Sequence, residues 1–218
     1  MLKLFNTYHF KVYYRNSLFM TDRKYKIVIG SRKSPLARKQ VEIFKSSFSE
    51  RFLSNEKIKF QSKFLSTSGD KFLNQRLSKI GNKGLFTKEI DEAQIAGDID
   101  LSVHSLKDLP FRLPKGLKIG AYLKREDYRD AYISRNNKTL FQLKKNAIIG
   151  TSSTRREAQL KKIRSDFQFK VIRGNVESRI KKVKAGKYDA TLLAMAGLKR
   201  LNIRDEFHPL SLNNFIPA

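Results

Sequence analysis

Residues 26–35 read KIVIGSRKSP, a short apolar run followed by a glycine, a turn rich in basic and hydroxyl side chains, and a proline. Residues 147–156 repeat this order as AIIGTSSTRR. An apolar run of strand length that leads through a polar turn into an amphipathic stretch is typical of a strand passing into a helix around a parallel sheet. These two stretches therefore predict an α/β fold.

The same alternation continues along the chain on both sides of these stretches. Strands are predicted at residues 26–30, 58–64, 101–104, 147–150, 169–172 and 190–193. Two further strands, which cross between halves, are predicted at residues 117–123 and 131–134. Helices are predicted at residues 35–51, at residues 85–95 and after each of the last three strands. Pro35 suits a first helical turn, because its missing N–H would have no partner there in any case.

The pattern divides into two α/β lobes with mixed, mainly parallel sheets, at residues 25–120 and 121–218. Ligands of such folds bind beyond the carboxyl ends of the strands, so we expect the site in the cleft between the lobes. Residues 1–24 lack the apolar run of an export signal, and Met20 offers an alternative start. We therefore expect an N-terminal extension outside the fold.

The composition excludes several classes of site. The 218 residues contain no cysteine, so this sequence offers no disulfide, thiolate metal ligand or cysteine nucleophile. His9, His104 and His208 are too far apart for a local zinc motif, and we predict no metal site. No apolar run approaches the length that spans a bilayer, and we expect a cytoplasmic protein.

The charge balance indicates an anionic ligand. The sequence has 46 Lys and Arg against 20 Asp and Glu, a net charge of +26. Such a balance would attract nucleic acid, an anionic membrane or a small polycarboxylate. Most single lysines are expected to form a solvated surface, so the arginines at the predicted strand ends are more informative than the total.

Basic and hydroxyl side chains recur at three predicted strand-to-helix junctions, where helix amides are free to meet an anion. They are Arg32 and Ser34 at the first junction, Ser153, Arg155 and Arg156 at the second, and Arg173 and Arg179 at the third. Guanidinium groups bind carboxylates through two parallel bonds, so several around one cleft predict a ligand with several carboxylates or phosphates. The hydroxyls of the second junction, Ser153 among them, have an equally good reading as simple helix N-caps.

Residues 103–110, VHSLKDLP, form the remaining polar group. His104 has the ordinary reading of a histidine at a strand end, and Asp108 that of a turn residue before proline. In the functional reading, Asp108 beside Lys107 faces the basic cleft and stabilises a cationic intermediate. Ser105 belongs to the same loop and would have a supporting role.

The order of several motifs resembles that of the porphobilinogen deaminase family, from about Lys26 to Ala218. The motifs are IGSRKSPLAR, STSGD, NKGLFTKEI, DIDLSVHSLKDLP, REDYRDAYIS, GTSSTRREAQL, VIRGNVESRI and LLAMAGLKRL. The resemblance implies a transferase of tetrapyrrole (haem) biosynthesis, a hydroxymethylbilane synthase. Such an enzyme joins four porphobilinogen molecules head to tail, with loss of ammonia, to give hydroxymethylbilane. It also implies an architecture similar to type II periplasmic binding proteins.

The resemblance carries residue roles onto matching positions. It implies that Asp108 is catalytic. It implies a dipyrromethane cofactor bound by Arg32, Ser34, Lys107, Asp108, Ser153, Arg155, Arg156, Arg173 and Arg179. It implies substrate binding by Arg32, Phe86, Arg155, Arg173, Arg179 and Arg200.

One feature departs from the family's pattern. Family members carry a third domain whose cysteine anchors the dipyrromethane, whereas this sequence has no cysteine. We therefore expect a truncated form, without that third domain, whose activity alone is in doubt. The resemblance implies a monomer that acts on porphobilinogen, with no nucleic-acid or membrane partner. The alternatives are a non-catalytic two-lobed anion-binding module and, from charge alone, a nucleic-acid-binding domain.

Overall fold

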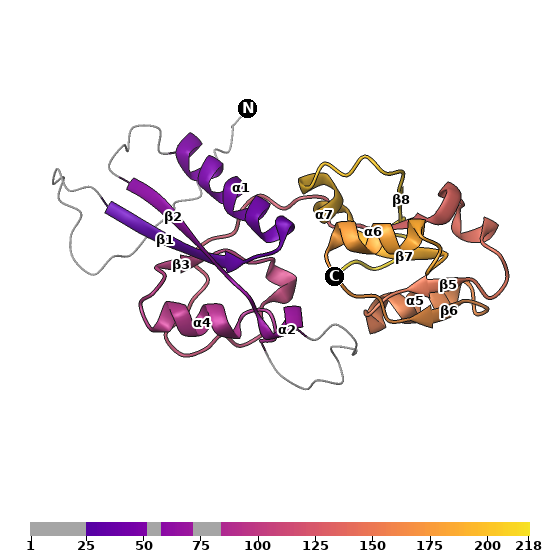
Figure 1. Ribbon diagram of the computed structural model, residues 1–218, viewed down its shortest axis with the longest axis horizontal. Helices are drawn as coiled ribbons and strands as arrows, with labels where there is room; N and C mark the ends of the chain where they lie inside the picture. The colour runs from indigo at the N-terminus through magenta and orange to yellow at the C-terminus, as the bar shows by residue number, and fades with distance from the viewer. Residues whose placement is uncertain (1–24, 52–57, 72–83) are drawn as a thin grey trace, which may run out of the picture.

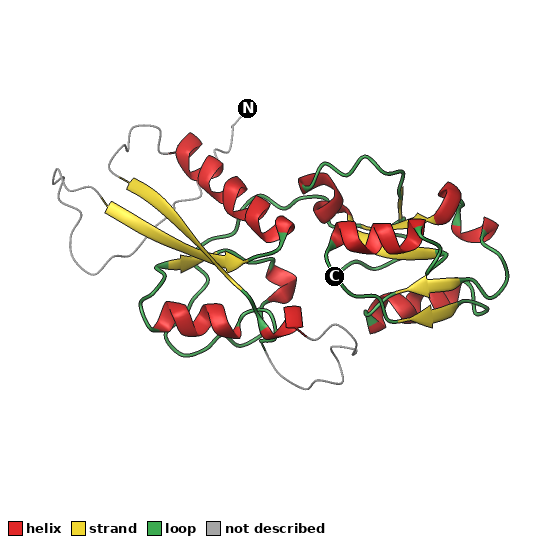
Figure 2. Ribbon diagram, viewed as in Figure 1, coloured by secondary structure: helices red, strands yellow, loops and turns green. Residues whose placement is uncertain are grey.

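The computed structural model describes residues 25–51, 58–71 and 84–218 (Figure 1). The expected extension at residues 1–24 lies outside the described residues. Two separate sheets, each covered by helices, are joined by a long loop (Figure 2). We call residues 25–109, built on the first sheet, lobe 1, and residues 130–218, built on the second, lobe 2. The predicted α/β class with mixed, mainly parallel sheets is confirmed.

Lobe 1 contains a parallel sheet of three strands in the order β2-β1-β3. The strands are β1 (Tyr25–Arg32), β2 (Ile58–Leu65) and β3 (Leu101–Ser102), and the helices are α1 (Pro35–Arg51), α2 (Ser68–Lys71), α4 (Lys88–Ile95) and the 3-10 turn η1 (Leu106–Asp108). Helices α1 and α4 lie on opposite sides of the strands (Figure 1). A Cβ atom at Gly30 would clash with the side chain of Ile99. The glycine therefore allows Ile99 to pack closely on β1.

Lobe 2 contains a mixed sheet in the order β6-β5-β7-β4-β8. The strands are β4 (Asp130–Ser134), β5 (Ile148–Gly150), β6 (Gln168–Lys170), β7 (Ala190–Ala194) and β8 (His208–Pro209). The helices are α5 (Thr154–Ile163), α6 (Val176–Lys184), α7 (Met195–Arg200), and the 3-10 turns η2 (Arg135–Asn137) and η3 (Leu140–Gln142). Strands β5, β6 and β7 are parallel, whereas β4 runs antiparallel to β7 and to β8.

The core of lobe 2 lies on both faces of this sheet. Leu160 of α5 belongs to a buried cluster on one face, together with Ile149 and Leu192. Ile180 of α6 and Leu198 of α7 belong to a second cluster with Leu193. Because neighbouring strand residues point to opposite faces, Leu192 and Leu193 of β7 serve different clusters. This two-sided burial explains the nearly continuous apolar runs in the sequence.

The predicted strand at residues 117–123 is wrong. Residues 109–129 contain no helix or strand, and Ile119, Tyr122 and Leu123 are exposed. A strand is stabilised by hydrogen bonds to a neighbouring strand, and no described segment pairs with this one. The predicted boundary between residues 120 and 121 falls inside this loop and stays a prediction.

The helix predicted from residue 85 begins three residues later, at Lys88. Residues 84–87 form a turn in which the Thr87 and Lys88 amides donate to the Gly84 carbonyl. Thr87 has φ −127°, outside the helical range, so the helix begins only after it. None of the helices that the structure describes is long and apolar enough to cross a membrane.

Candidate active-site cleft

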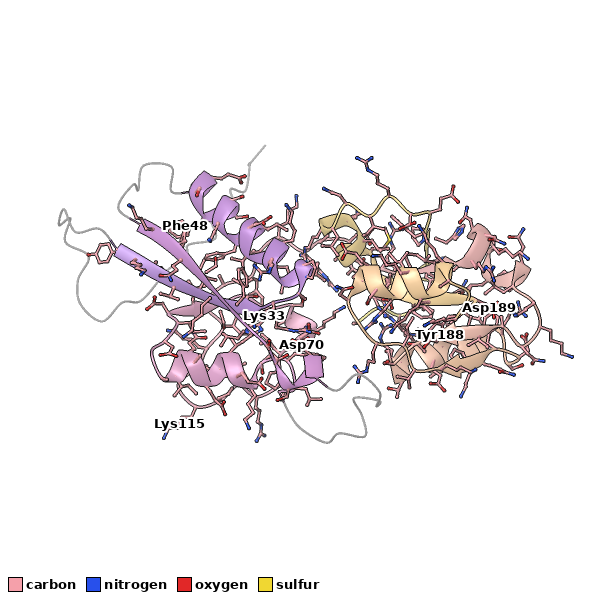
Figure 3. All side chains as sticks on the ribbon, in the orientation of Figure 1. Lys33, Phe48, Asp70, Lys115, Tyr188 and Asp189 are labelled. Atoms are coloured by element: carbon pink, nitrogen blue, oxygen red, sulfur yellow. The ribbon has the colours of Figure 1, made fainter. Side chains whose placement is uncertain are left out.

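A cleft of about 1770 Å³ is lined by residues of both lobes. Most of the residues predicted for the site line it: Arg32, Ser34, Phe86, His104, Ser105, Lys107, Asp108, Ser153, Arg156, Arg173, Arg179 and Arg200. Arg155 does not. Asp70, labelled in Figure 3, also lines the cleft and lies on the part of lobe 1 nearest lobe 2. The fold thus gathers residues that are up to 168 positions apart, from Arg32 to Arg200, at one surface.

Arg32 lies at the carboxyl end of β1 and is held from several sides. Its guanidinium carbon stands 4.2 Å above the centre of the Phe86 ring, and its Nη2 donates to Oδ1 of Asp70. Its Nη1 lies 4.0 Å from Oδ2 of Asp108. A cation over an aromatic face is attracted by the ring's electrons. Arg32 therefore has a defined position between the ring and two carboxylates.

The position of Phe86 depends on Gly69. A Cβ atom at Gly69 would overlap the Phe86 ring, and the Gly69 amide donates to the Leu85 carbonyl at 2.7 Å. The next residue, Asp70, accepts bonds from Arg32 and from the Thr67 hydroxyl, the latter at 2.8 Å. Burial alone would raise the pKa of Asp70, but these hydrogen bonds outweigh it and lower the pKa. Asp70 is thus an ionised partner that the sequence reasoning did not identify.

Asp108 closes the short turn η1 and has fewer partners. Its side chain is 30% exposed, and its carboxylate accepts no hydrogen bond from any residue in the described ranges. The nearest cation is Arg32, at the 4.0 Å given above. A carboxylate with open lone pairs in a basic cleft is able to receive a ligand's N–H groups or to face a positive charge.

His104 lies beside this turn. Burial lowers its pKa, Asp108 opposes the shift, and Arg32 adds to it. Its Nε2 is buried without a hydrogen-bond partner among the described residues. His104 is therefore neutral near pH 7, and it adds no positive charge to that of Arg32, Lys33 and Lys107 on this side of the cleft.

Lys107 is solvent-exposed but stands over the cleft opposite lobe 2. Desolvation by the surrounding residues is the main reason that its pKa is lowered, and repulsion from Arg156 of lobe 2 lowers it further. Asp108 and Asp130 act in the opposite direction. Lys107 and Arg156 line the same cleft from opposite lobes.

The two predicted hydroxyls cap helices. Ser34 Oγ accepts from the Ala37 amide at 3.3 Å at the start of α1, and Ser153 Oγ accepts from the Arg156 amide at 3.4 Å at the start of α5. The reading of Ser153 as an N-cap is confirmed. Both residues also line the cleft.

The paired arginines at the start of α5 share one carboxylate. Arg155 Nη2 lies 2.6 Å from Oδ2 of Asp130, and Arg156 Nη2 lies 2.7 Å from Oδ1. Arg155 also donates to the Ile216 carbonyl, which explains why it turns away from the cleft. Sequence reasoning missed Asp130, although it lies in the quoted REDYRDAYIS motif at the start of β4. The motif holds three acids, Glu126, Asp127 and Asp130, and nothing in the sequence alone singles out the third.

Arg173 and Arg179 add cations on the other wall of lobe 2. Burial lowers the pKa of Arg173. Burial, followed by repulsion from Arg156 and Arg173, lowers the pKa of Arg179 to about 10. Arg179 Nε donates to the Gly174 carbonyl at 2.9 Å, and Arg179 forms no ion pair within the described residues. These groups repel each other, so an anion between them would be stabilising.

The cleft suits an organic anion better than a metal. No group of three or more His, Asp or Glu side chains within the described ranges could hold a metal ion. Arg32, Arg156, Arg173, Arg179 and Arg200 instead provide guanidinium forks, with Asp108 as an open carboxylate. Several forks around one cleft match a ligand with several carboxylates.

The family model described as "Porphobilinogen deaminase, dipyromethane cofactor binding domain" matches residues 27–218. The chain belongs to the porphobilinogen deaminase family. The family resemblance drawn from the sequence motifs is therefore confirmed, and with it the dipyrromethane as the cofactor that this family domain binds.

Curated relatives agree with this membership. The chain is 49% identical over 197 residues to porphobilinogen deaminase of Geotalea uraniireducens (strain Rf4), covering 87% of this chain and 59% of the relative. It is 48% identical over 182 residues to that of Chlorobium phaeovibrioides (strain DSM 265 / 1930), covering 84% and 57%. The chain thus spans a little over half the length of these relatives.

Among solved structures, the chain is similar to the probable amino-acid ABC transporter extracellular-binding protein ytmK from Bacillus subtilis. The TM-score is 0.46 and the identity 14%, covering 89% of this chain and 81% of that protein.

Proposed function

We propose that this chain provides the catalytic cleft of a hydroxymethylbilane synthase, which joins four porphobilinogen molecules head to tail with loss of ammonia. The observation that carries the proposal is that Asp108, with an open carboxylate, lines the same cleft as Arg156, Arg173 and Arg179 of the opposite lobe. The family's relatives, which bear the name porphobilinogen deaminase, support the same activity. Tetrapyrrole biosynthesis is the pathway to which such an activity belongs.

The arginines would bind the acidic side chains of the substrate. Porphobilinogen carries an acetate and a propionate, so each added unit brings two more negative charges into the cleft. Arg173 and Arg179 repel each other when no anion lies between them, and a carboxylate there would raise the lowered pKa of each. Arg200, half-buried at the end of α7, would bind a further carboxylate. Substrate binding therefore relieves a repulsion that the fold creates.

Asp108 would stabilise positive charge during the reaction. When the protonated aminomethyl group leaves as ammonia, the C–N bond breaks and its electron pair departs with nitrogen. The pyrrole ring then carries a positive charge that extends to its ring nitrogen. A fixed carboxylate beside that nitrogen stabilises the charge without reorganising solvent. Phe86, already packed under Arg32, would lie beside the substrate ring.

The residues in the cleft also fit the family's dipyrromethane cofactor, which carries the same acidic side chains as the substrate. Arg32, Lys107, Arg156, Arg173 and Arg179 would hold its carboxylates, and Ser34 and Ser153 lie at helix starts whose amides accept anions. When bound, the dipyrromethane supplies the pyrrole to which the first substrate unit is joined. The family's anchoring residue is a cysteine, and these 218 residues contain none.

The test is to incubate the purified chain with porphobilinogen, alone and with the separately expressed C-terminal part of the Geotalea relative. Binding is measured by calorimetry, and turnover by uroporphyrin formed after acid oxidation. Bilane formation in either mixture supports the proposal. Binding without turnover in both mixtures would favour the alternative, a non-catalytic anion-binding module. If the chain shows neither binding nor turnover, both the proposal and the anion-binding alternative are overturned.

The setting of this activity is part of the proposal. We expect a cytoplasmic monomer with lobes at residues 25–120 and 121–218, whose partner is a small molecule rather than nucleic acid or a membrane. The support is the placement of arginines inside a cleft, because a nucleic-acid surface would present them along an exposed stripe.

A further inference from the structure

Asp130 is an acidic residue inside the otherwise basic wall of lobe 2. Its side chain is 3% exposed, and the residue lines the cleft. Both of its carboxylate oxygens accept charged hydrogen bonds, Oδ2 from Arg155 at 2.6 Å and Oδ1 from Arg156 at 2.7 Å. A buried carboxylate is costly unless it is paired in this way, and removing a partner leaves the other charge uncompensated.

The second contact of Arg156 completes its orientation. Its Nη1 donates to the Leu192 carbonyl of β7 at 2.8 Å. The guanidinium, which is carried by α5, is therefore held by β4 through Asp130 and by β7 through Leu192. Three elements of lobe 2 thus determine where one cleft cation points.

The Arg155 side chain, unlike that of Arg156, is not part of the cleft wall. It contacts the other oxygen of Asp130 and the Ile216 carbonyl, and it does not line the cleft. Asp130 also acts across the cleft. Arg156 lowers the pKa of Lys107, and the negative charge of Asp130 partly offsets that shift. One carboxylate thus binds two adjacent arginines, one through each oxygen, and it also reduces the repulsion that Lys107 meets across the cleft.

We propose that Asp130 is a positioning residue that holds Arg156 in a fixed orientation on the cleft wall to receive a carboxylate of the ligand. The proposal rests on the proposed function for the identity of that ligand, but not for the positioning itself. A fixed guanidinium binds more tightly, because less side-chain freedom is lost when the ligand arrives.

The first experiment measures positioning without any ligand. Asp130→Asn keeps the size of the side chain but removes its charge, so it can no longer accept from both arginines. We expect the Nε and Nη signals of Arg156 in NMR spectra to show slow rotation of the guanidinium in the wild type and faster rotation in the variant. Equal rotation in both would overturn the proposal.

The second experiment measures binding of porphobilinogen by calorimetry. Asp130→Asn should weaken binding roughly tenfold, the effect expected for losing a charged hydrogen bond. In an Arg156→Leu background, Asp130→Asn should have no further effect, because Asp130 acts through Arg156. Equal losses in both backgrounds would show a merely structural role and overturn the proposal.

Asp166→Asn is the matched control. Asp166 also pairs with an arginine, Arg164, but does not line the cleft. The Asp166→Asn variant should bind porphobilinogen as tightly as the wild type. Thermal melting shows whether each variant is folded. A wild-type chain that binds no porphobilinogen would contradict the proposed function, and the rotation of Arg156 would still decide the role of Asp130.

Discussion

The acidic residues of the cleft differ in their partners. Asp70 and Asp130 each accept hydrogen bonds from arginines, whereas the Asp108 carboxylate accepts none within the described ranges. A paired carboxylate holds its cation in place, and an open one is free to act on a ligand. The three residues therefore have different expected effects when they are replaced.

Asp108→Ala should lower bilane formation by about 10²-fold or more while keeping the fold, because a charge-stabilising group is removed without breaking a described hydrogen bond. The assay is uroporphyrin formation by an active form of the protein, with circular dichroism to check folding. Asp98→Asn, which breaks an exposed ion pair with Lys63 outside the cleft, is the control. Near-normal turnover of Asp108→Ala would remove Asp108 from the mechanism.

His104 should make stability depend on pH. Burial lowers its pKa in the folded protein, so below about pH 6.5, the ordinary value for histidine, the unfolded chain binds more protons. The stabilisation that neutral His104 provides is complete above that pH and is lost as the pH falls toward the folded pKa. Urea unfolding at pH 7.5 and 5.5 should show a smaller loss for His104→Gln than for the wild type. An identical loss in both would contradict this account.

At the scale of elements, the turns between strands and helices place the site. The turn after β6 positions Arg173 and leads to α6, whose N-cap Asn175 accepts from the Ser178 amide at 2.8 Å. Gly174 in this turn has φ 109°, a conformation that other residues rarely adopt. The orientation of both Arg173 and Arg179 therefore depends on one glycine.

Gly174→Ala should destabilise the protein by about 2 kcal/mol or more, because it combines backbone strain with a clash against Ser178 Oγ. Gly97→Ala is the matched control, since Gly97 also has a positive φ, 82°, but nothing within 4 Å of the added Cβ. Urea unfolding measures both. A loss for Gly174→Ala no larger than that for Gly97→Ala would contradict the added cost of the clash with Ser178.

At the scale of the molecule, the two lobes present positive charge to each other across the cleft. Arg32 and Lys107 lie on lobe 1, and Arg156, Arg173 and Arg179 lie on lobe 2. Desolvation, and then repulsion from Arg156 on the opposite lobe, lowers the pKa of Lys107. An anionic ligand would therefore stabilise the approach of the lobes.

Binding of porphobilinogen should weaken several-fold when salt rises from about 50 mM to about 500 mM, because ions screen the attraction between the cleft and the ligand. Calorimetry at several salt concentrations measures this, with sucrose at equal osmolality as the control. Affinity that is independent of salt would contradict a cleft governed by charge. Tight, steeply salt-dependent binding of any DNA duplex would instead favour the nucleic-acid alternative.

The local patterns of the sequence determined most of the secondary structure. Helix α1 spans Pro35–Arg51 as predicted, because proline, the preceding serine and an amphipathic stretch all favour that start. The segment at residues 117–123 has an equally suitable local pattern and forms no strand, since strand formation requires a partner from elsewhere in the chain.

The sequence by itself also determined which residues are able to bind an anion, because charge and hydrogen-bonding groups belong to the side chains. Only the tertiary structure decided how they are used. Arg155 and Arg156 are adjacent and chemically identical, yet Arg156 lines the cleft and Arg155 turns toward Ile216. Both donate to Asp130, which lies 25 residues earlier than Arg155, but Arg155 also donates to the Ile216 carbonyl and Arg156 to the Leu192 carbonyl. Contacts between distant segments exist only in the folded chain, and they set the direction of each charge.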